Sequence, residues 1–437
     1  LSRQRQAGVV AFFHPFCNDG GGGERVLWCA VAAVHERWPR ACVVVYTGDA
    51  EPDEAILAKA KERFGIALAR PVRFVRLRHR WLVEARTYPR LTMLGQLAGG
   101  ALLALEAVAR LPPAVFVDTT GAAGSYPVAR LLVGARTACY VHYPTISADM
   151  VSAVASRSEA HNNARAIARS RAMTALKVAY YAAFAALYAL CGAFAGLVAA
   201  NSSWTAGHIA AVWRRRAQVV FPPCDTRALE AIPLAPAARE QLVLSIGQYR
   251  PEKDHALQLE AFATLLQRWP VDLSAARLVM IGACRNAGDR ARALALRQRA
   301  ADLGLSARVQ VLEDLPHGER SRWLARAACG MHTMWMEHFG IGVVELMAAG
   351  VVPVAHNSGG PRADIIVPGE GQGLPGRLAA TAPEYAEALR ELLEMAQAND
   401  GRYARLQAEA REAARRFSDE AFAQRFGAFM APLLDQL

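Results

Sequence analysis

Short apolar runs alternate with longer stretches of helical periodicity along the first half of the chain. The apolar runs are continuous rather than alternating, which is typical of strands buried on both faces of a sheet. We expect strands at residues 9–13, 42–47, 114–117, 138–142 and 196–200. A helix is expected from about Glu24, after a glycine-rich loop. This alternation predicts a parallel sheet with helices on both faces.

A second alternating series follows a proline-rich break at residues 221–240. The break contains Pro222, Pro223, Pro233 and Pro236, which interrupt any helix or central strand. Beyond it, we expect strands at residues 242–246, 277–281, 309–312, around Gly330, and at 351–355. The simplest architecture is two doubly wound Rossmann-like α/β domains facing one cleft, with ligands at the carboxyl ends of the strands.

The predicted domains span residues 1–222 and 223–417. Residues 418–437 are expected to form a terminal helix that packs back on the N-terminal domain. The chain begins with Leu1 rather than Met, so we expect a segment upstream, such as an anchor.

Residues 178–200 form an uncharged stretch of 23 residues after Lys177, which is long enough to cross a membrane. The stretch is rich in alanine, contains Gly192 and Gly196, and ends in a strand pattern before Asn201. We therefore predict an apolar helix followed by a buried strand. Where that helix is exposed, it would rest on a bilayer rather than cross it.

The formal net charge of +11 favours an anionic partner: a phosphate, a nucleic acid or a membrane surface. No nucleic-acid-binding module and no clustered basic and aromatic stripe is recognisable, so we expect no nucleic-acid partner. The eight cysteines form no CxxC pair, which argues against a zinc site or a redox dithiol.

Two loops between a strand and a helix are candidates for binding phosphate. The first contains Gly21, Gly22 and Gly23, whose backbone can approach a ligand closely beside a helix N-terminus. A plain flexible turn would use the same glycines. The second presents Arg250 and Lys253, two cations suited to a diphosphate whose charge grows as a bond to it breaks. A solvated loop with capping charges is the alternative.

Two further segments carry groups suited to sugar chemistry. Glu337 and Glu345 lie eight positions apart, the first in a loop and the second on an apolar helix beginning near Gly342. Their apolar surroundings would make burial without partners costly, so we expect a ligand there. His142 ends a predicted strand, where it can bond a sugar or transfer a proton, although a structural role is equally open.

Together these segments resemble the GT-B glycosyltransferases of family 4. The two glutamates with Phe-Gly after the first, the pair Glu252 and Lys253, and the run from Asn201 to Trp204 resemble that family's motifs. The segments 14–27, 142–150, 220–226, 247–255 and 331–361 resemble, within it, the eukaryotic α-1,2-mannosyltransferases that use GDP-mannose and a dolichol-diphosphate-linked Man3GlcNAc2 acceptor.

The resemblance implies a retaining enzyme that needs no metal or other cofactor. It would add the fourth and fifth mannoses at the cytosolic face of the endoplasmic reticulum. Glu337 would hold hydroxyls of the transferred mannose, with His142 at the reaction centre. The remaining donor-binding residues would be Arg250, Lys253, Glu345, Phe339, Gly340, Ile341 and the glycines Gly21, Gly22 and Gly23. Implied partners are GDP-mannose, the dolichol-linked oligosaccharide, a membrane surface and other mannosyltransferases of the pathway.

Two departures from the family pattern matter. Gln248 stands where the wider family usually has arginine, and Arg250 is the nearest residue that could supply that charge. Relatives also tend to carry an N-terminal membrane helix, which this sequence does not contain. Another GT-B nucleotide-sugar enzyme remains the alternative, either a different lipid-linked glycosyltransferase or a sugar-nucleotide epimerase.

Overall fold

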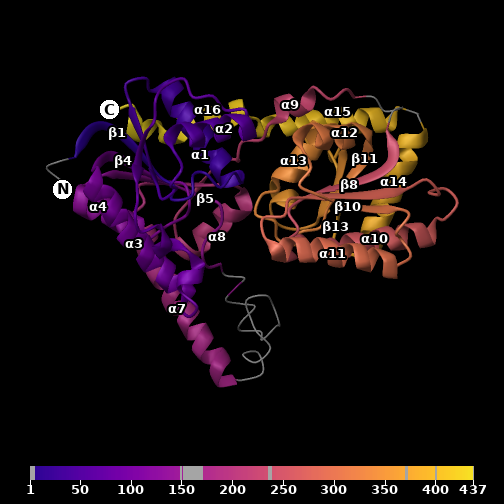
Figure 1. The fold of residues 1–437 in the computed structure, drawn as a ribbon, viewed down its shortest axis with the longest axis horizontal. Coiled ribbons are helices and arrows are strands. Elements are labelled where there is room, and N and C mark those ends of the chain that lie inside the picture. The colour runs from indigo at the N-terminus through magenta and orange to yellow at the C-terminus, as the bar shows by residue number, and fades with distance from the viewer. Residues whose placement is uncertain are drawn as a thin grey trace. The chain divides into compact units, whose positions relative to one another are not determined.

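The computed structural model describes residues 5–147, 150, 171–234, 239–369, 373–398 and 401–436 (Figure 1). Residues 148 and 149 of the segment 142–150 lie outside the described residues, and so does Pro236. The chain divides into two compact units. Unit 1 comprises Leu1–Pro223 with Phe422–Leu437, and unit 2 comprises Cys224–Ala421.

Unit 1 is built on a parallel sheet in the order β3-β2-β1-β4-β5-β6-β7. Its strands are β1 (Gln6–Phe13), β2 (Cys42–Thr47), β3 (Arg73–Arg76), β4 (Pro113–Asp118), β5 (Arg136–Val141), β6 (Leu197–Ala200) and β7 (Gln218–Val219). The strand order reverses direction between β1 and β4, which makes this the topological switch point of the sheet.

Both faces of this sheet are buried, as the continuous apolar runs predict. Val10 and Phe12 of β1 belong to one apolar cluster, whereas Ala11 and Phe13 belong to another on the opposite face. Successive side chains of a strand point to opposite faces, so a strand covered on both faces must be apolar throughout.

The helices of unit 1 cover these faces. Among the described residues, these helices are α1 (Gly22–Arg37), α2 (Asp53–Phe64), α3 (Thr92–Arg110), α4 (Ser125–Val133), α7 (Arg171–Gly192), α8 (Ser203–Trp213) and, from Phe422 onward, α16 (Asp419–Leu434); the 3-10 turns are η2 (Arg80–Val83) and η3 (Ala85–Thr87). Phe422, Phe426 and Phe429 of α16 lie in the same apolar cluster as β1 and α1. Helices α3, α4 and α7 contact one another (Figure 1).

Unit 2 repeats the design with a parallel sheet in the order β10-β9-β8-β11-β12-β13. Its strands are β8 (Glu240–Ile246), β9 (Arg277–Gly282), β10 (Val309–Glu313), β11 (Ala327–His332), β12 (Val352–His356) and β13 (Arg377–Ala379). Its helices are α9 (Thr226–Glu230), η5 (Pro251–Lys253), α10 (His255–Arg268), α11 (Ala287–Asp302), α12 (His317–Arg326), α13 (Ile341–Ala348), the π-helix η6 (Pro361–Ile365), α14 (Ala382–Ala398), α15 (Arg402–Ala414) and η7 (Arg415–Phe417).

The predicted fold class is confirmed, since both units are parallel-sheet Rossmann-like α/β structures. The helix and buried strand predicted for residues 178–200 are also present, as α7 and β6. Helix α1 begins at Gly22, two residues before the predicted start near Glu24, and the short helix α9, which Asp225 caps, lies between Pro223 and Pro233 of the proline-rich break.

Candidate functional site

The carboxyl ends of the neighbouring strands β8 and β11 bring two distant segments of unit 2 together. After β8, the chain forms the 3-10 turn η5 and then enters α10 through Asp254, which has a positive φ of 45°. The Asp254 carboxylate caps α10 by accepting from the Leu257 amide at 3.2 Å. After β11, the chain runs through a loop containing Glu337 and then enters α13. The ends of parallel neighbours meet at one edge, which places Lys253 beside that loop.

Glu337 lies at the centre of this edge and has protein partners on both oxygens. Its Oε2 accepts from the Lys253 ammonium, and His332 Nε2 lies 3.1 Å from the same oxygen. Oε1 accepts from the His338 amide at 3.2 Å. The sequence argument that this carboxylate needs a ligand to be paired is therefore wrong. Protein groups already pair with the Glu337 carboxylate, so a ligand would bind to a cluster of side chains that is already formed.

The charges of this cluster set the protonation states. Burial by itself would raise the pKa of Glu337, but the Lys253 ammonium and the His332 hydrogen bond lower it well below its usual range. Burial lowers the pKa of His332; the hydrogen bond with Glu337 opposes this effect, and the Lys253 charge adds to it. Glu337 is therefore an ionised, weakly basic carboxylate that accepts hydrogen bonds, and His332 is a neutral donor to it.

Thr333, four residues before Glu337 in the chain, joins the two segments by hydrogen bonds. Its buried hydroxyl lies 2.8 Å from the Lys253 carbonyl and 2.9 Å from that of Asp254. Gln258 Nε2 donates to the same hydroxyl at 3.0 Å. A hydroxyl has one proton and two lone pairs, so Thr333 donates to this turn while accepting from α10. This hydrogen bonding fixes the backbone that carries Lys253.

The loop that contains Glu337 also packs against the segment after β12 and is hydrogen-bonded to it. The Met336 amide donates to Ser358 Oγ at 2.8 Å, and the Gly360 amide donates to the Glu337 carbonyl at 2.8 Å. A Cβ on Gly360 would lie 2.5 Å from Phe339 Cα, so only glycine permits this approach. Gly340, with a φ of 113°, turns the chain into α13. The loop is preorganised by backbone contacts on both sides.

The other predicted donor-site residues of unit 2 have different surroundings. Glu345 lies on α13, with its Oε2 3.8 Å from Arg320 Nη1, so it also has a protein partner. Arg250 is partly exposed and lies 3.7 Å from Glu252. The Phe339 ring is buried against Phe417, which leaves its backbone rather than its ring for a ligand. Ile341 begins α13 directly after Gly340.

In unit 1, the glycine segment meets the ends of β1 and β4. Gly22 and Gly23 are the first residues of α1, and only Gly21 precedes the helix. The Gly21 amide donates to the Glu24 carboxylate, so one amide expected to face a phosphate is already used. Burial would raise the pKa of Glu24, but His14 and the Gly21 amide lower it below its usual value. His14 in turn contacts Thr119 Oγ1 at 2.8 Å and Glu24 Oε1 at 3.3 Å.

His142 follows the last residue of β5 and is half-buried beside this segment. Its Nε2 lies 3.1 Å from the Thr119 carbonyl, which can only accept, so the proton belongs on Nε2. A Cβ on Gly23 would lie 3.6 Å from the same nitrogen. The structure therefore places His142 against the start of α1.

Sequence reasoning missed three polar residues of these two sites. His14 directly follows β1, His332 is the last residue of β11 and Thr333 follows it, so their positions at strand ends were the available signal. Among the residues that the structure describes, no group of three His, Cys, Asp or Glu side chains is arranged to hold a metal ion.

Two family models match the sequence. Residues 7–213 match the ALG11 mannosyltransferase N-terminus, and residues 230–416 match glycosyl transferases group 1. The mouse GDP-Man:Man(3)GlcNAc(2)-PP-Dol alpha-1,2-mannosyltransferase is 45% identical over 98% of this chain and 87% of its own length. The Dictyostelium discoideum protein of the same name is 41% identical over 98% of this chain and 85% of its own length.

Solved structures agree on the fold. Anabaena HepE in complex with UDP and glucose is 18% identical, with a TM-score of 0.63 over 98% of this chain and all of its own. A glycosyltransferase from Rickettsia africae is 13% identical, with a TM-score of 0.66 over 98% and 99% of the two chains. At these identities the likeness establishes the fold alone.

Proposed function

The chain belongs to the family of GDP-Man:Man(3)GlcNAc(2)-PP-Dol alpha-1,2-mannosyltransferases, and on that basis we propose that it transfers mannose from GDP-mannose to dolichol-diphosphate-linked Man3GlcNAc2. It is a glycosyltransferase and, by the names of its relatives, a mannosyltransferase. The finer proposal is that it adds the fourth and fifth mannoses with retention of configuration and without a metal. The cluster of Lys253, His332 and Glu337 is the observation that carries this proposal.

That cluster suits the donor's two chemical parts. An ammonium has three donors, so Lys253 can hold Glu337 and a diphosphate oxygen at once. An ionised carboxylate with lone pairs to spare can accept from mannose hydroxyls, with help from amides near Phe339, Gly340 and Ile341. Arg250 would add charge at the diphosphate and Glu345 would bind the ribose. The segment from Gly21 to Gly23 would lie alongside the donor.

The proposed chemistry follows from the low basicity of Glu337. The bond between mannose C1 and the diphosphate oxygen breaks, and its electron pair leaves with GDP, stabilised by the cations. The acceptor hydroxyl attacks C1 on the face that GDP leaves, and its proton passes to a diphosphate oxygen. A double displacement would need a nucleophilic carboxylate. Glu337 is poorly suited to that role because Lys253 and His332 already bind its Oε2. His142 would bond the sugar near the reacting carbon.

Membrane contact is the second part of the proposal, since enzymes of dolichol-linked pathways are membrane-associated. Two helices of unit 1, Thr92–Arg110 and Met173–Gly192, are long and apolar enough to cross a membrane by length and composition only. However, α7 buries Tyr181, Phe184 and Tyr188 against its own unit. Its opposite face exposes Leu176 and Leu190. A helix with one face packed on protein is suited to rest on the cytosolic surface of the endoplasmic reticulum.

The proposal is tested by supplying purified protein with GDP-mannose and lipid-diphosphate-linked Man3GlcNAc2 in the presence of EDTA. Mass spectrometry should show a gain of two hexoses, both removable by an α-1,2-mannosidase. Turnover with a UDP-sugar but not with GDP-mannose would replace the assignment by another GT-B nucleotide-sugar enzyme. Loss of activity in EDTA, restored by a divalent cation, would overturn metal independence.

A further inference from the structure

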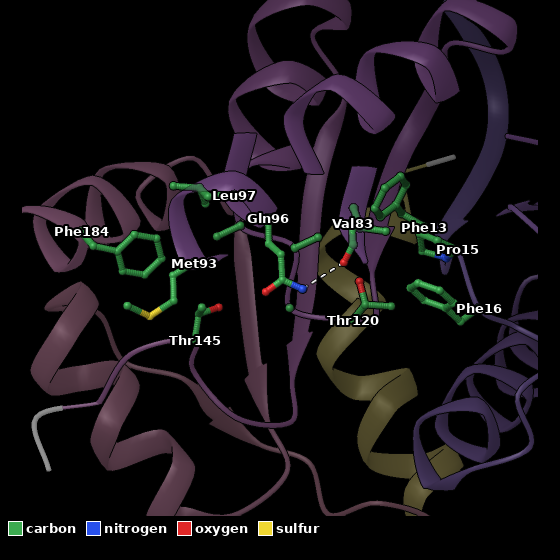
Figure 2. A pocket seen from close by; sticks show the side chains of 13 residues that line it. Phe13, Pro15, Phe16, Val83, Met93, Gln96, Leu97, Thr120, Thr145 and Phe184 are labelled. Atoms are coloured by element: carbon green, nitrogen blue, oxygen red, sulfur yellow. Dashed lines mark hydrogen bonds between the residues drawn. The ribbon is translucent and has the colours of Figure 1, made fainter. Parts of the chain in front are cut away.

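Unit 1 contains a pocket of about 180 Å³ that the donor-site residues do not line. Its walls are mostly apolar, with a few polar groups among them (Figure 2). The lining includes Phe16, Met93, Gln96, Leu97, Thr120 and Thr145. Met93, Gln96 and Leu97 belong to the first two turns of α3.

The pocket lies at the topological switch point of the sheet. Phe13 is the last residue of β1, and Thr120 and Gly121 follow the last residue of β4. Strands β1 and β4 are the neighbours between which the strand order reverses, and ligands of open α/β sheets bind outside the carboxyl ends at that point. Its position alone therefore makes this pocket a candidate ligand site.

The pocket is also close to His142. Thr120 follows Thr119, whose carbonyl accepts from His142 Nε2 at 3.1 Å. Thr145 lies three residues beyond His142 in the chain. A group bound here would therefore be near the histidine that we place at the reaction centre.

The chemistry of the lining fits a sugar ring. Gln96 Nε2 donates to the Val83 carbonyl at 3.0 Å, and among the described residues no donor contacts its Oε1 (Figure 2). That oxygen can accept from a hydroxyl, whereas Phe16, Met93 and Leu97 offer apolar surface to ring C–H groups. An apolar cavity of about 150 Å³ binds benzene, so this pocket has the size of roughly one six-membered ring.

We propose that this pocket is the subsite for one terminal sugar ring of the acceptor glycan, with Gln96 Oε1 accepting from one of its hydroxyls. The inference rests on the proposed function and names the part of the acceptor that unit 1 recognises. The isoprenoid is a less suitable occupant for a geometric reason. In Man(3)GlcNAc(2)-PP-Dol, the sugars and a diphosphate separate the lipid from the mannose that receives the next sugar.

Binding of soluble Man3GlcNAc2 that carries no lipid tests the proposal directly. Gln96→Leu keeps the side-chain size but removes the amide oxygen, and Met93→Trp fills the pocket while Gln96 itself is retained. Leu102→Gln, on the exposed surface of the same helix, is the matched control. Calorimetry measures glycan affinity, circular dichroism checks folding, and transfer assays give the Michaelis constants for acceptor and donor.

We expect Gln96→Leu to weaken glycan binding and raise the acceptor KM roughly 5- to 20-fold, as for the loss of one buried hydrogen bond. Met93→Trp should weaken glycan binding and raise the acceptor KM further. Leu102→Gln should change neither quantity, and the KM for GDP-mannose should stay the same in all three variants. Unchanged glycan affinity in both folded pocket variants overturns the proposal. The proposal is also overturned if the variants weaken the binding of dolichyl phosphate instead of the binding of glycan. If the wild type binds glycan through this pocket but transfers no mannose, the subsite stands and the proposed function fails.

Discussion

Lys253 and Glu337 form an ion pair across 84 positions of sequence, in a site where His332 contacts the same carboxylate oxygen. The two side chains are largely buried, with 23% and 13% of their surfaces exposed. Such a pair is held by the fold rather than by local sequence, because each residue follows a different strand of the sheet. Its disruption should therefore affect both stability and donor binding.

The first prediction concerns the stability of this pair. Lys253→Met and Glu337→Gln should each destabilise unit 2 by about 1–3 kcal/mol, because each leaves one partly buried charge without its partner. The double variant should cost less than the sum of the two, since it leaves neither charge. Urea unfolding of the ligand-free protein measures all three values. Additive losses would mean that the two charges do not interact in solution.

The second prediction concerns catalysis by Glu337. Glu337→Gln keeps the shape of the side chain but weakens its acceptance of sugar hydroxyls, so kcat should fall by about 100-fold or more. Glu337→Ala should abolish transfer while the circular dichroism spectrum remains that of a folded protein. Substantial turnover by a folded Glu337→Ala variant would refute the role assigned to this carboxylate.

Thr333 provides a third prediction, because it acts on Lys253 through the backbone. Thr333→Val removes the hydroxyl that donates to the carbonyls of Lys253 and Asp254. With the turn less constrained, the GDP-mannose KM should rise about 3- to 10-fold, an effect of the size of one weakened hydrogen bond. The acceptor KM should not change. Thr264→Val is the matched control, because that hydroxyl donates to the Glu260 carbonyl of its own helix. Equal effects of the two substitutions would show that Thr333 has only a structural role.

Much of the fold could be predicted because central parallel strands are marked by continuous apolar runs. The run at residues 42–47 coincides with β2, and that at 277–281 falls within β9. The strands β3, β7 and β13 were missed. They are two to four residues long, carry Arg or Gln, and lie at sheet edges. Edge strands are short and polar, so the apolar pattern fades where pairing on one side ends.

The candidate site could be predicted only as separate segments. Glycine, proline and charge at strand ends pointed to Lys253 and Glu337, but no local pattern pairs them. His332 and Thr333 read as the end of a buried strand, and only the neighbouring positions of β8 and β11 give them partners. The pocket at Gln96 was missed for a similar reason, since it combines η2, α3 and the ends of two strands.

A fourth prediction concerns Glu345, which we propose binds the donor ribose. Glu345→Gln should raise the GDP-mannose KM about 10-fold, because a charged acceptor becomes a neutral one. Its effect on kcat should be smaller than that of Glu337→Gln. Arg320→Met serves as the comparison, since Arg320 lies 3.8 Å from Glu345. An equal rise in both variants would indicate that the ion pair, rather than the carboxylate itself, determines donor affinity.

The last prediction is a pH dependence caused by His255. This buried side chain begins α10, and burial together with the charge of Lys253 lowers its pKa to about 4. In the unfolded chain the same group has a pKa near 6.5. The unfolded state therefore takes up a proton first as the pH falls, and the free energy of unfolding should decrease between about pH 6.5 and 4.

The loss over that range should be on the order of 2–3 kcal/mol from this residue. Above pH 7 the side chain is neutral in both states, so the slope from His255 should vanish. His255→Gln cannot take up the proton and should flatten the curve between pH 6.5 and 4. Urea denaturation at half-unit steps of pH measures both proteins. An identical slope in wild type and His255→Gln would show that other groups cause the acid sensitivity.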